Sequence, residues 1–159
     1  MEVNVIDVGC AHYQSFKSIE HICDQDEFEV KFALGLDPRC EPDTYWYRDE
    51  TLVTMLDMAA WTSTGSAGFM EDALGSHVLE AGDGDRRVKT IDLAPLVRVF
   101  SPVVLKIDAE GAEYPLLEHL LDQGITNLIH LAWIEWHGDE SRAKPLIDRL
   151  ECDYAEWRL

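Results

Sequence analysis

The chain has 159 residues, of which 47% are hydrophobic and 28% are charged. A domain of this length buries enough apolar surface to fold without a disulfide or a structural metal. Its 31 acidic and 13 basic residues give a formal charge of −18, which repels phosphate backbones and anionic membrane surfaces. We therefore expect neither nucleic acid nor a membrane as a partner of this acidic protein.

No apolar run in the sequence approaches the roughly 20 residues needed to cross a bilayer. The N-terminus enters a strand-like run at Val3 without the basic and long apolar segments of a secretory signal. We expect a cytoplasmic location, in which thiols stay reduced. The cysteines agree with this expectation, because they are scattered and form no C-x-x-C pair: Cys10, Cys23, Cys40 and Cys152.

The opening of the chain predicts a strand, a helix and a second strand. The first strand runs from Val3 to Val8 and is closed by Gly9, and a polar, helix-compatible stretch covers about 13–24. The second strand covers Glu29 to Leu36 and ends before Pro38. A right-handed crossover through the helix makes the two strands parallel.

The middle of the chain is less regular. Its patterns predict, in order, a loop or short helix over 40–50, a third strand over 51–61, a hairpin or irregular excursion over 69–87, a short strand over 88–91, and a helix over 93–100 that Asp92 caps.

The last third alternates again between strands and helices. We expect strands at 103–107 and 128–136, helices at 110–123 and 141–150, and an edge strand at 154–159. Taken together, the elements predict a single domain over residues 1–159 of the α/β class. The expected fold is a Rossmann-like, doubly wound and mostly parallel sheet, with helices on both faces and an antiparallel edge strand at the C-terminus.

Acidic residues recur where the predicted strands end. Ligands of an open parallel sheet bind beyond the carboxyl ends of its strands. Any one of these acids has an alternative interpretation as a helix cap or a solvated loop residue. As a set they indicate a site: Asp7, Asp37, Asp57, Asp108, and Glu135 together with His137.

Asp37 is the most informative of these acids. An acid that ends the second strand is placed to accept hydrogen bonds from both ribose hydroxyls of an adenosine cofactor. A dinucleotide also needs a G-x-G-x-x-G loop for its pyrophosphate, whereas the first turn here contains only Gly9. S-adenosylmethionine has no pyrophosphate, so the sequence favours a methyltransferase over an NAD-linked oxidoreductase.

Several segments resemble FkbM-type methyltransferases in content and order: Asp7-Val8-Gly9, Gly35-Leu36-Asp37-Pro38, Ala59-Ala60-Trp61, Thr90-Ile91-Asp92-Leu93, and above all the string Lys106-Ile107-Asp108-Ala109-Glu110-Gly111-Ala112-Glu113. The resemblance implies the class I methyltransferase fold. It also implies methyl transfer from S-adenosylmethionine to an oxygen of a sugar or small metabolite. We expect the cofactor to contact residues at the ends of the first three strands and just beyond them: Asp7, Gly9, Cys10, Asp37, Pro38, Asp57, Met58 and Ala59.

Two departures from the family pattern leave alternatives open. The family usually places an alanine, an asparagine and then a second glycine after the first glycine, where this chain has Ala11 and Tyr13. The chain also begins almost at its first strand, so we expect it to lack the N-terminal cover region. A homo-oligomer could supply the missing wall. The alternatives are a methyltransferase-fold binding module with weakened catalysis and, further away, an NAD-linked oxidoreductase.

The expected catalytic residues are Asp108, Glu135 and His137. His137 follows a predicted strand at the correct end of the sheet, and its ordinary pKa suits a general base at neutral pH. The same three residues could instead bind a hard divalent ion such as Mg²⁺, which would orient a vicinal diol and acidify its hydroxyl. The sequence leaves the metal-free and metal-assisted forms equally open.

Overall fold

Two β-sheets form the framework of the protein. The computed structural model describes residues 1–10, 19–22, 24, 28–71, 77–79, 84–138 and 140–156. The larger sheet has the strand order β11-β10-β9-β1-β2-β4-β3 and is built from β1 (Glu2–Val8), β2 (Glu29–Leu36), β3 (Asp43–Tyr47), β4 (Thr51–Leu56), β9 (Val103–Ile107), β10 (Ile129–Ile134) and β11 (Asp153–Glu156). The smaller sheet has the order β5-β8-β6-β7 and is built from β5 (Ala59–Trp61), β6 (Gly65–Met70), β7 (His77–Leu79) and β8 (Arg86–Asp92).

The larger sheet is mostly parallel, as predicted. All of its neighbouring strands pair in parallel except β3, which runs antiparallel to β4. The central strand β9 is buried along its whole length, which explains its nearly continuous apolar sequence. The chain builds outward from β1 through β2 to β4 and then returns to β9 on the other side of β1. The strand order therefore reverses beside β1, where parallel sheets form ligand crevices.

The prediction of an antiparallel edge strand at the C-terminus is wrong. Strand β11 pairs in parallel with β10, from Leu131 opposite Asp153 to Ile134 opposite Glu156. The reason is the connection between them, which contains the helix α4 (Ala143–Ile147). It returns the chain to the end of the sheet at which β10 begins. A crossover of this kind produces a parallel neighbour, whereas an antiparallel one needs only a short turn.

The antiparallel strand lies at the opposite edge of the sheet. The segment 40–50, predicted as a loop or short helix, contains β3 instead. Arg48 and Asp49 have φ angles of 50° and 59°, the left-handed conformation that tight hairpin turns require, and they lead directly into β4. The predicted third strand over 51–61 is in fact two strands, because β4 stays in the larger sheet and β5 joins the smaller one.

The helices α2 (Leu93–Phe100), α3 (Glu113–Asp122) and α4 pack on one face of the larger sheet. Their apolar side chains share one core cluster with alternate residues of β1, β9 and β10. The 3-10 helices are η1 (Thr126–Leu128) and η2 (Glu140–Arg142). The predicted cap of α2 is confirmed, because Asp92 Oδ1 accepts a hydrogen bond of 3.0 Å from the Ala94 N–H.

The other face carries a second core cluster. Residues 19–22 are helical, and Ile19 and Ile22 pack there against Val5, Val53 and neighbours. The rest of the helix predicted over 13–24 lies outside the described residues, apart from position 24. Among the described residues, no helix has the length and apolar character that crossing a membrane requires.

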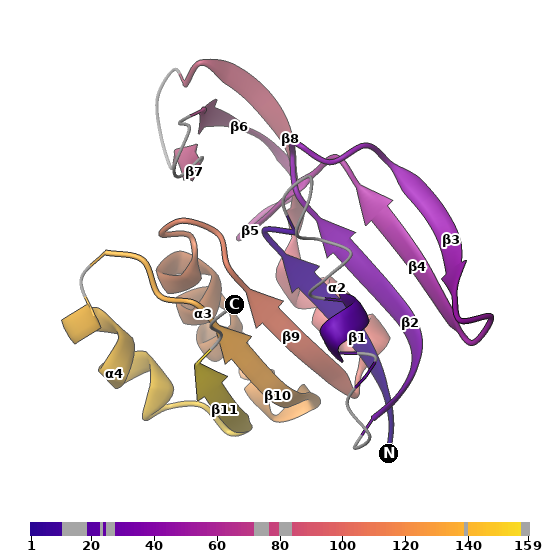
Figure 1. Ribbon diagram of the computed structural model, residues 1–159. Coiled ribbons are helices and arrows are strands. Elements are labelled where there is room, and N and C mark those ends of the chain that lie inside the picture. The colour runs from indigo at the N-terminus through magenta and orange to yellow at the C-terminus, as the bar shows by residue number, and fades with distance from the viewer. Residues whose placement is uncertain are drawn as a thin grey trace.

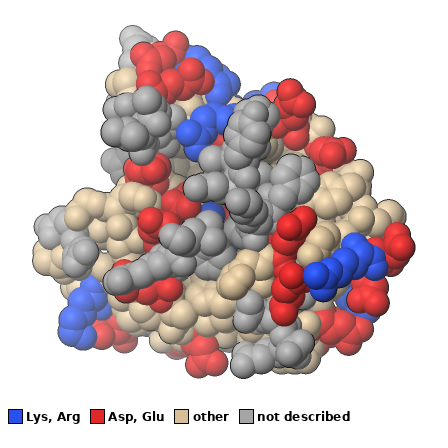
Figure 2. Space-filling view, viewed as in Figure 1, with Lys and Arg blue, Asp and Glu red and all other residues tan. Residues whose placement is uncertain are grey.

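The smaller sheet stands over the carboxyl ends of the strands of the larger one (Figure 1). Arg86 of β8 connects the smaller sheet to the larger one, since its Nη2 donates a 2.8 Å hydrogen bond to the carbonyl oxygen of Pro38 after β2. Acidic side chains are spread over the face shown in Figure 2, while basic ones gather in a few places.

Candidate functional site

Backbone hydrogen bonds align the ends of four strands of the larger sheet. The Gly9 N–H donates to Leu36 O at 2.9 Å, and the Asp108 N–H donates to Val8 O at 3.0 Å. The Glu135 N–H continues the row by donating to Ile107 O at 2.9 Å. The residues that follow β2, β1, β9 and β10 are thereby held along one edge of the sheet.

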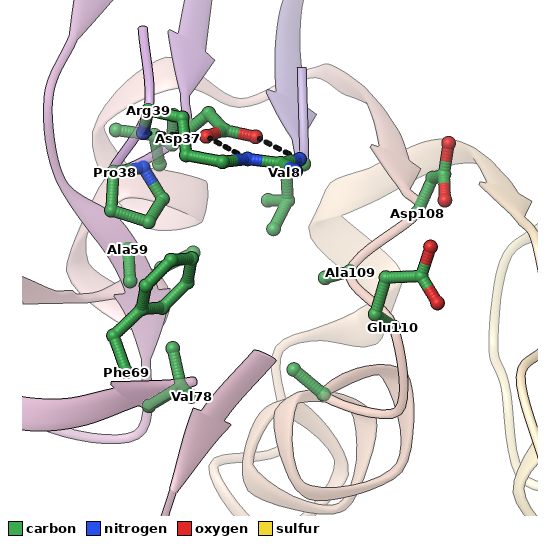
Figure 3. A pocket seen from close by; sticks show the side chains of 14 residues that line it. Val8, Asp37, Pro38, Arg39, Ala59, Phe69, Val78, Asp108, Ala109 and Glu110 are labelled. Carbon is green, nitrogen blue, oxygen red and sulfur yellow. Dashed lines mark hydrogen bonds and ion pairs between the residues drawn. The ribbon is translucent and has the colours of Figure 1, made fainter. Parts of the chain in front are cut away.

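A cavity opens at this edge, partly connected to solvent. Its lining is mostly apolar with a few polar groups, as in the ligand pockets of other proteins. One wall is formed by the ends of β1 and β2 and by the smaller sheet, with Pro38, Ala59, Phe69 and Val78 (Figure 3). Across from it, Asp108 and Glu110 place their carboxylates side by side (Figure 3). The cavity therefore has an apolar side and an acidic side.

Gly9 is required where the two sides meet. Its φ of +78° is a left-handed conformation, and a Cβ built on it would lie 1.6 Å from the carbonyl oxygen of Asp108. Because that oxygen belongs to the backbone of the adjacent strand end, no side-chain rotation relieves the clash. Only glycine lets the loops after β1 and β9 approach this closely.

We expect the Gly9→Ala variant to lose about 3 kcal/mol of unfolding free energy, from the clash and the left-handed conformation together. Urea unfolding followed by circular dichroism measures this loss. Gly124→Ala is the matched control, because Gly124 has a φ of +60° but nothing within 4 Å of the added Cβ. The control should lose only the conformational part, about 1–2 kcal/mol. Equal losses in both variants would contradict the close approach at Gly9.

Asp37 lies on the cavity wall at the end of β2. Its side chain is 3% exposed, and Arg39 is its partner. The Arg39 backbone N–H donates to Asp37 Oδ1 at 2.7 Å, while its guanidinium makes longer contacts of 3.3 and 3.4 Å with the two carboxylate oxygens. Because the guanidinium contacts are long and Arg39 is 35% exposed, a ligand hydroxyl can replace them without breaking the backbone turn.

A buried ion pair lies beneath the cavity. Lys106 of β9 is 3.0 Å from Asp7 Oδ1 and 3.4 Å from Asp108 Oδ2, and it donates to the carbonyl oxygen of Gly9 at 3.3 Å. Burial lowers the pKa of Lys106, but the Asp7 and Asp108 carboxylates outweigh it and hold the pKa above its usual value. The lysine is therefore charged at neutral pH and links the ends of β1 and β9.

Glu113 organises the loop between β9 and α3. Its side chain is fully buried, and its two oxygens accept hydrogen bonds of 2.8 Å from the Ala109 and Gly111 N–H groups. Oε1 also lies 3.0 Å from Nδ1 of His137. The carboxylate thus fixes both the loop that lines the cavity and the orientation of the imidazole that follows β10.

His137 presents its other nitrogen to three carboxylates. Nε2 is 3.8 Å from Asp108 Oδ1, 3.7 Å from Glu110 Oε2 and 3.9 Å from Glu135 Oε1. Burial alone would lower the pKa of His137, but the hydrogen bond to Glu113 and the surrounding carboxylates raise it above its ordinary value. The imidazole is therefore protonated over a wider pH range than a free histidine.

The carboxylates around His137 carry more negative charge than their partners neutralise. Burial and the neighbouring Asp108 raise the pKa of both Glu110 and Glu135, although His137 opposes the shift. Asp108, Glu110 and His137 each offer a ligand atom within 4.8 Å of the other two. This group can hold a cation, a proton or a hydrogen-bonding ligand.

Of the eight residues predicted for the cofactor, four line the cavity: Gly9, Asp37, Pro38 and Ala59. The other four do not line it: Asp7, Cys10, Asp57 and Met58. Of the predicted catalytic residues, Asp108 lines the cavity, whereas Glu135 and His137 do not. Asp7 is buried in the pair with Lys106, and Cys10 packs in the core, where burial raises the pKa of its thiol. Asp57 is 46% exposed, with Lys89 at 3.9 Å.

Of the predicted metal ligands, Asp108 and His137 belong to the compact group of ligand atoms. Glu135 contacts the imidazole but is 41% exposed, and Glu110 takes its place in that group. The helix predicted over 110–123 includes Glu110, whereas α3 begins only at Glu113 and Glu110 has a φ of 51° in the preceding turn. That turn places Glu110 on the cavity wall with its carboxylate near His137.

Three further residues of the site were not predicted as site residues from the sequence: Arg39, Lys106 and Glu113. A lysine inside a strand that is otherwise wholly apolar was a usable signal for Lys106, because a buried ammonium needs a charged partner. Glu113 gave no distinguishing signal, since an acid in the first turn of a helix is equally favoured as a surface residue. Comparisons with protein family models, curated proteins and solved structures found no significant match to this chain.

Proposed function

We propose that the protein is an S-adenosylmethionine-dependent methyltransferase of the FkbM type, with a Rossmann-like fold, that methylates a hydroxyl of a sugar or small metabolite. The observation that carries the proposal is the cavity at the point of strand-order reversal, with Asp37 and Gly9 on its wall. Adenosine cofactors bind parallel sheets at this point, with an acid at the end of the second strand on the ribose.

The cavity residues suit a cofactor that has an adenosyl group and no pyrophosphate. Asp37 offers a carboxylate that can accept from two ribose hydroxyls once Arg39 moves aside. Ala59, Phe69 and Val78 offer an apolar surface for an adenine ring. The turn after β1 contains a single glycine, which permits close backbone approach but provides no pyrophosphate cradle. These features support S-adenosylmethionine over a dinucleotide.

The resemblance of the string from Lys106 to Glu113 to the FkbM motif supports the same proposal, and the structure gives its polar members physical roles. Lys106 joins the ends of β1 and β9, and Asp108 and Glu110 line the cavity. Glu113 holds the loop between them. All four residues therefore act on the same part of the molecule.

The acidic side of the cavity suits the acceptor. The cofactor would supply the methyl group of its sulfonium, whose S–C bond breaks and leaves a thioether as the new O–C bond forms, and the acceptor oxygen must lose its proton. In the metal-free form His137 takes that proton at Nε2, while Glu113 holds Nδ1 and stabilises the imidazolium. Asp108 and Glu135 lie close enough to Nε2 to orient a hydroxyl beside it.

Two substitutions separate the cofactor and acceptor roles. We expect Asp37→Asn to weaken binding of S-adenosylhomocysteine by about 10- to 100-fold, since hydrogen bonds to a charged group contribute about 1.5–3 kcal/mol. We expect His137→Gln to leave that affinity within about twofold and to slow methyl transfer by about 10²- to 10⁴-fold. Isothermal titration calorimetry measures the first effect, and a single-turnover assay over a panel of hydroxyl acceptors measures the second.

Asp122→Asn is the matched control for Asp37, because its carboxylate is 75% exposed on the far end of α3. It should bind S-adenosylhomocysteine as the wild type does. An unchanged affinity in Asp37→Asn, or a loss of affinity in His137→Gln with full turnover, would contradict the assigned roles.

A further inference from the structure

We propose that Asp108, Glu110 and His137 bind one divalent metal ion of the Mg²⁺ or Mn²⁺ class. Nε2 of His137 lies 3.7 Å from Glu110 Oε2 and 3.8 Å from Asp108 Oδ1. Adjacent ligands of an octahedral ion, each about 2.1 Å from the metal, are about 3 Å apart. Side-chain movements of about 1 Å would therefore bring the three ligand atoms onto an ion.

Glu113 supports this assignment from behind the imidazole. A histidine that ligates a metal through one nitrogen usually donates its other N–H to a carboxylate, which fixes the ring and its tautomer. Glu113 provides that carboxylate, because it is fully buried and its Oε1 lies 3.0 Å from Nδ1. Two backbone N–H groups hold Glu113 itself in place. Nε2 is thereby left to face Asp108 and Glu110.

The charges at the site also favour a cation. Carboxylates of Asp108, Glu110 and Glu135 lie within 4 Å of a single imidazole nitrogen. Lys106 is 3.4 Å from Asp108, but its charge is shared with the buried Asp7 at 3.0 Å. A divalent ion would offset the repulsion among the carboxylates, and two oxygen ligands to one nitrogen favour a hard ion.

The ligand group is open to solvent, because the side chains of Asp108, Glu110 and His137 are 16%, 31% and 26% exposed. Asp108 and Glu110 also line the cavity across from Pro38 and Phe69, and their carboxylates point away from it (Figure 3). A metal site needs such an access path as well as ligands and second-shell support. Glu135, which is 41% exposed, lies beside this ligand group rather than in it.

The ion would also define the acceptor, and this step rests on the proposed function. A metal ion held by these residues next to the acceptor would bind two neighbouring hydroxyls at once and lower the pKa of the one to be methylated. The acceptor class would then be a vicinal diol, such as adjacent ring hydroxyls of a sugar. His137 would hold the ion, and Glu135 would take the proton that the hydroxyl loses.

Titration of the full chain with Mn²⁺ tests the site. Electron paramagnetic resonance detects the binding, in 150 mM KCl and without any cofactor. Salt at this concentration screens the general attraction of a −18 protein for cations. We expect one saturable site in the wild type, at least tenfold weaker binding in Glu110→Gln and in Asp108→Asn, and displacement by Mg²⁺. Glu118→Gln is the matched control, since Glu118 is an exposed acid on α3 and should leave binding unchanged.

Circular dichroism and thermal unfolding of each variant show whether it is folded, and the isosteric Glu110→Gln keeps the test available if Asp108→Asn is unstable. Absence of a saturable site, or equal weakening in Glu110→Gln and Glu118→Gln, would overturn the proposal. Because the cofactor is left out, these outcomes do not depend on methyl transfer. If the wild-type protein binds Mn²⁺ but not S-adenosylhomocysteine, the result would instead contradict the proposed function alone.

Discussion

We expect the Lys106→Met variant to lose about 3–5 kcal/mol of unfolding free energy, the cost of removing one partner of a buried ion pair. The side chains of Asp7 and Lys106 are 0% and 3% exposed, so the carboxylate of Asp7 would stay buried without its counter-charge. The loss should be constant around neutral pH. The stabilisation from a raised lysine pKa is complete below the ordinary value near 10.4 and disappears only as the pH rises through the raised one.

Lys144→Met provides the same chemical change on the surface. Lys144 is 78% exposed and pairs with Asp148 at 2.8 Å along α4 and its end, so its loss should cost at most about 0.5 kcal/mol. The double variant Asp7→Asn with Lys106→Met should regain part of the stability, because it removes the uncompensated charge. Urea unfolding measures all of these variants. Equal losses for Lys106→Met and Lys144→Met would show that the buried pair does not stabilise the strand ends.

The second large effect is expected at Glu113, where alanine should lower the unfolding free energy by about 3–4 kcal/mol. The substitution removes the acceptor for the Ala109 and Gly111 N–H groups and for the His137 imidazole, and it leaves a buried void. Glu113→Gln keeps the volume and one accepting oxygen, so it should lose only about 1–2 kcal/mol.

The comparison is made with Glu118→Ala on the same helix, an exposed position where the loss should stay within about 0.5 kcal/mol. The unfolding midpoint and slope in urea give the free energies. Glu113→Ala should also weaken Mn²⁺ and S-adenosylhomocysteine binding, since the loop it anchors lines the cavity. A loss below 1 kcal/mol at Glu113 would mean that the loop is held by other contacts.

Features that depend on nearby residues could be predicted from the sequence. The apolar runs located β1, β2, β9 and β10, and the Asp92 cap located the start of α2. The parallel order of the sheet followed from strands alternating with helical patterns. In each case the deciding signal lies within a few residues, where periodicity and capping chemistry act.

The predictions that were wrong concern features that depend on residues far apart in the sequence. Whether the last strand runs parallel or antiparallel depends on the path of the connection through α4, which periodicity does not encode. The break between β4 and β5 lies inside a continuous apolar run, and only the pairing of β5 with β8 separates the two. The sequence of β3, with three consecutive aromatic residues, did carry β-propensity that the loop prediction overlooked.

The candidate site shows the same division. Sequence position placed Asp37, Asp108 and His137 at the correct edge of the sheet, because the carboxyl ends of parallel strands share one edge. The contact between Glu113 and His137 joins residues 24 apart and could not be inferred from either segment alone. The group of ligand atoms contains Glu110 and not the predicted Glu135, and this difference likewise depends on the backbone of one turn.

Calorimetric titration of the wild-type protein with S-adenosylmethionine, S-adenosylhomocysteine and NAD tests the central claim most directly. The cavity with Asp37 and the single-glycine turn predicts saturable binding of both sulfur compounds and none of NAD over the same concentrations. The Asp37→Asn variant in the same experiment assigns the heat to this cavity. Absence of saturable heat with either sulfur compound, or saturable binding of NAD alone, would contradict the assignment of the protein as a methyltransferase.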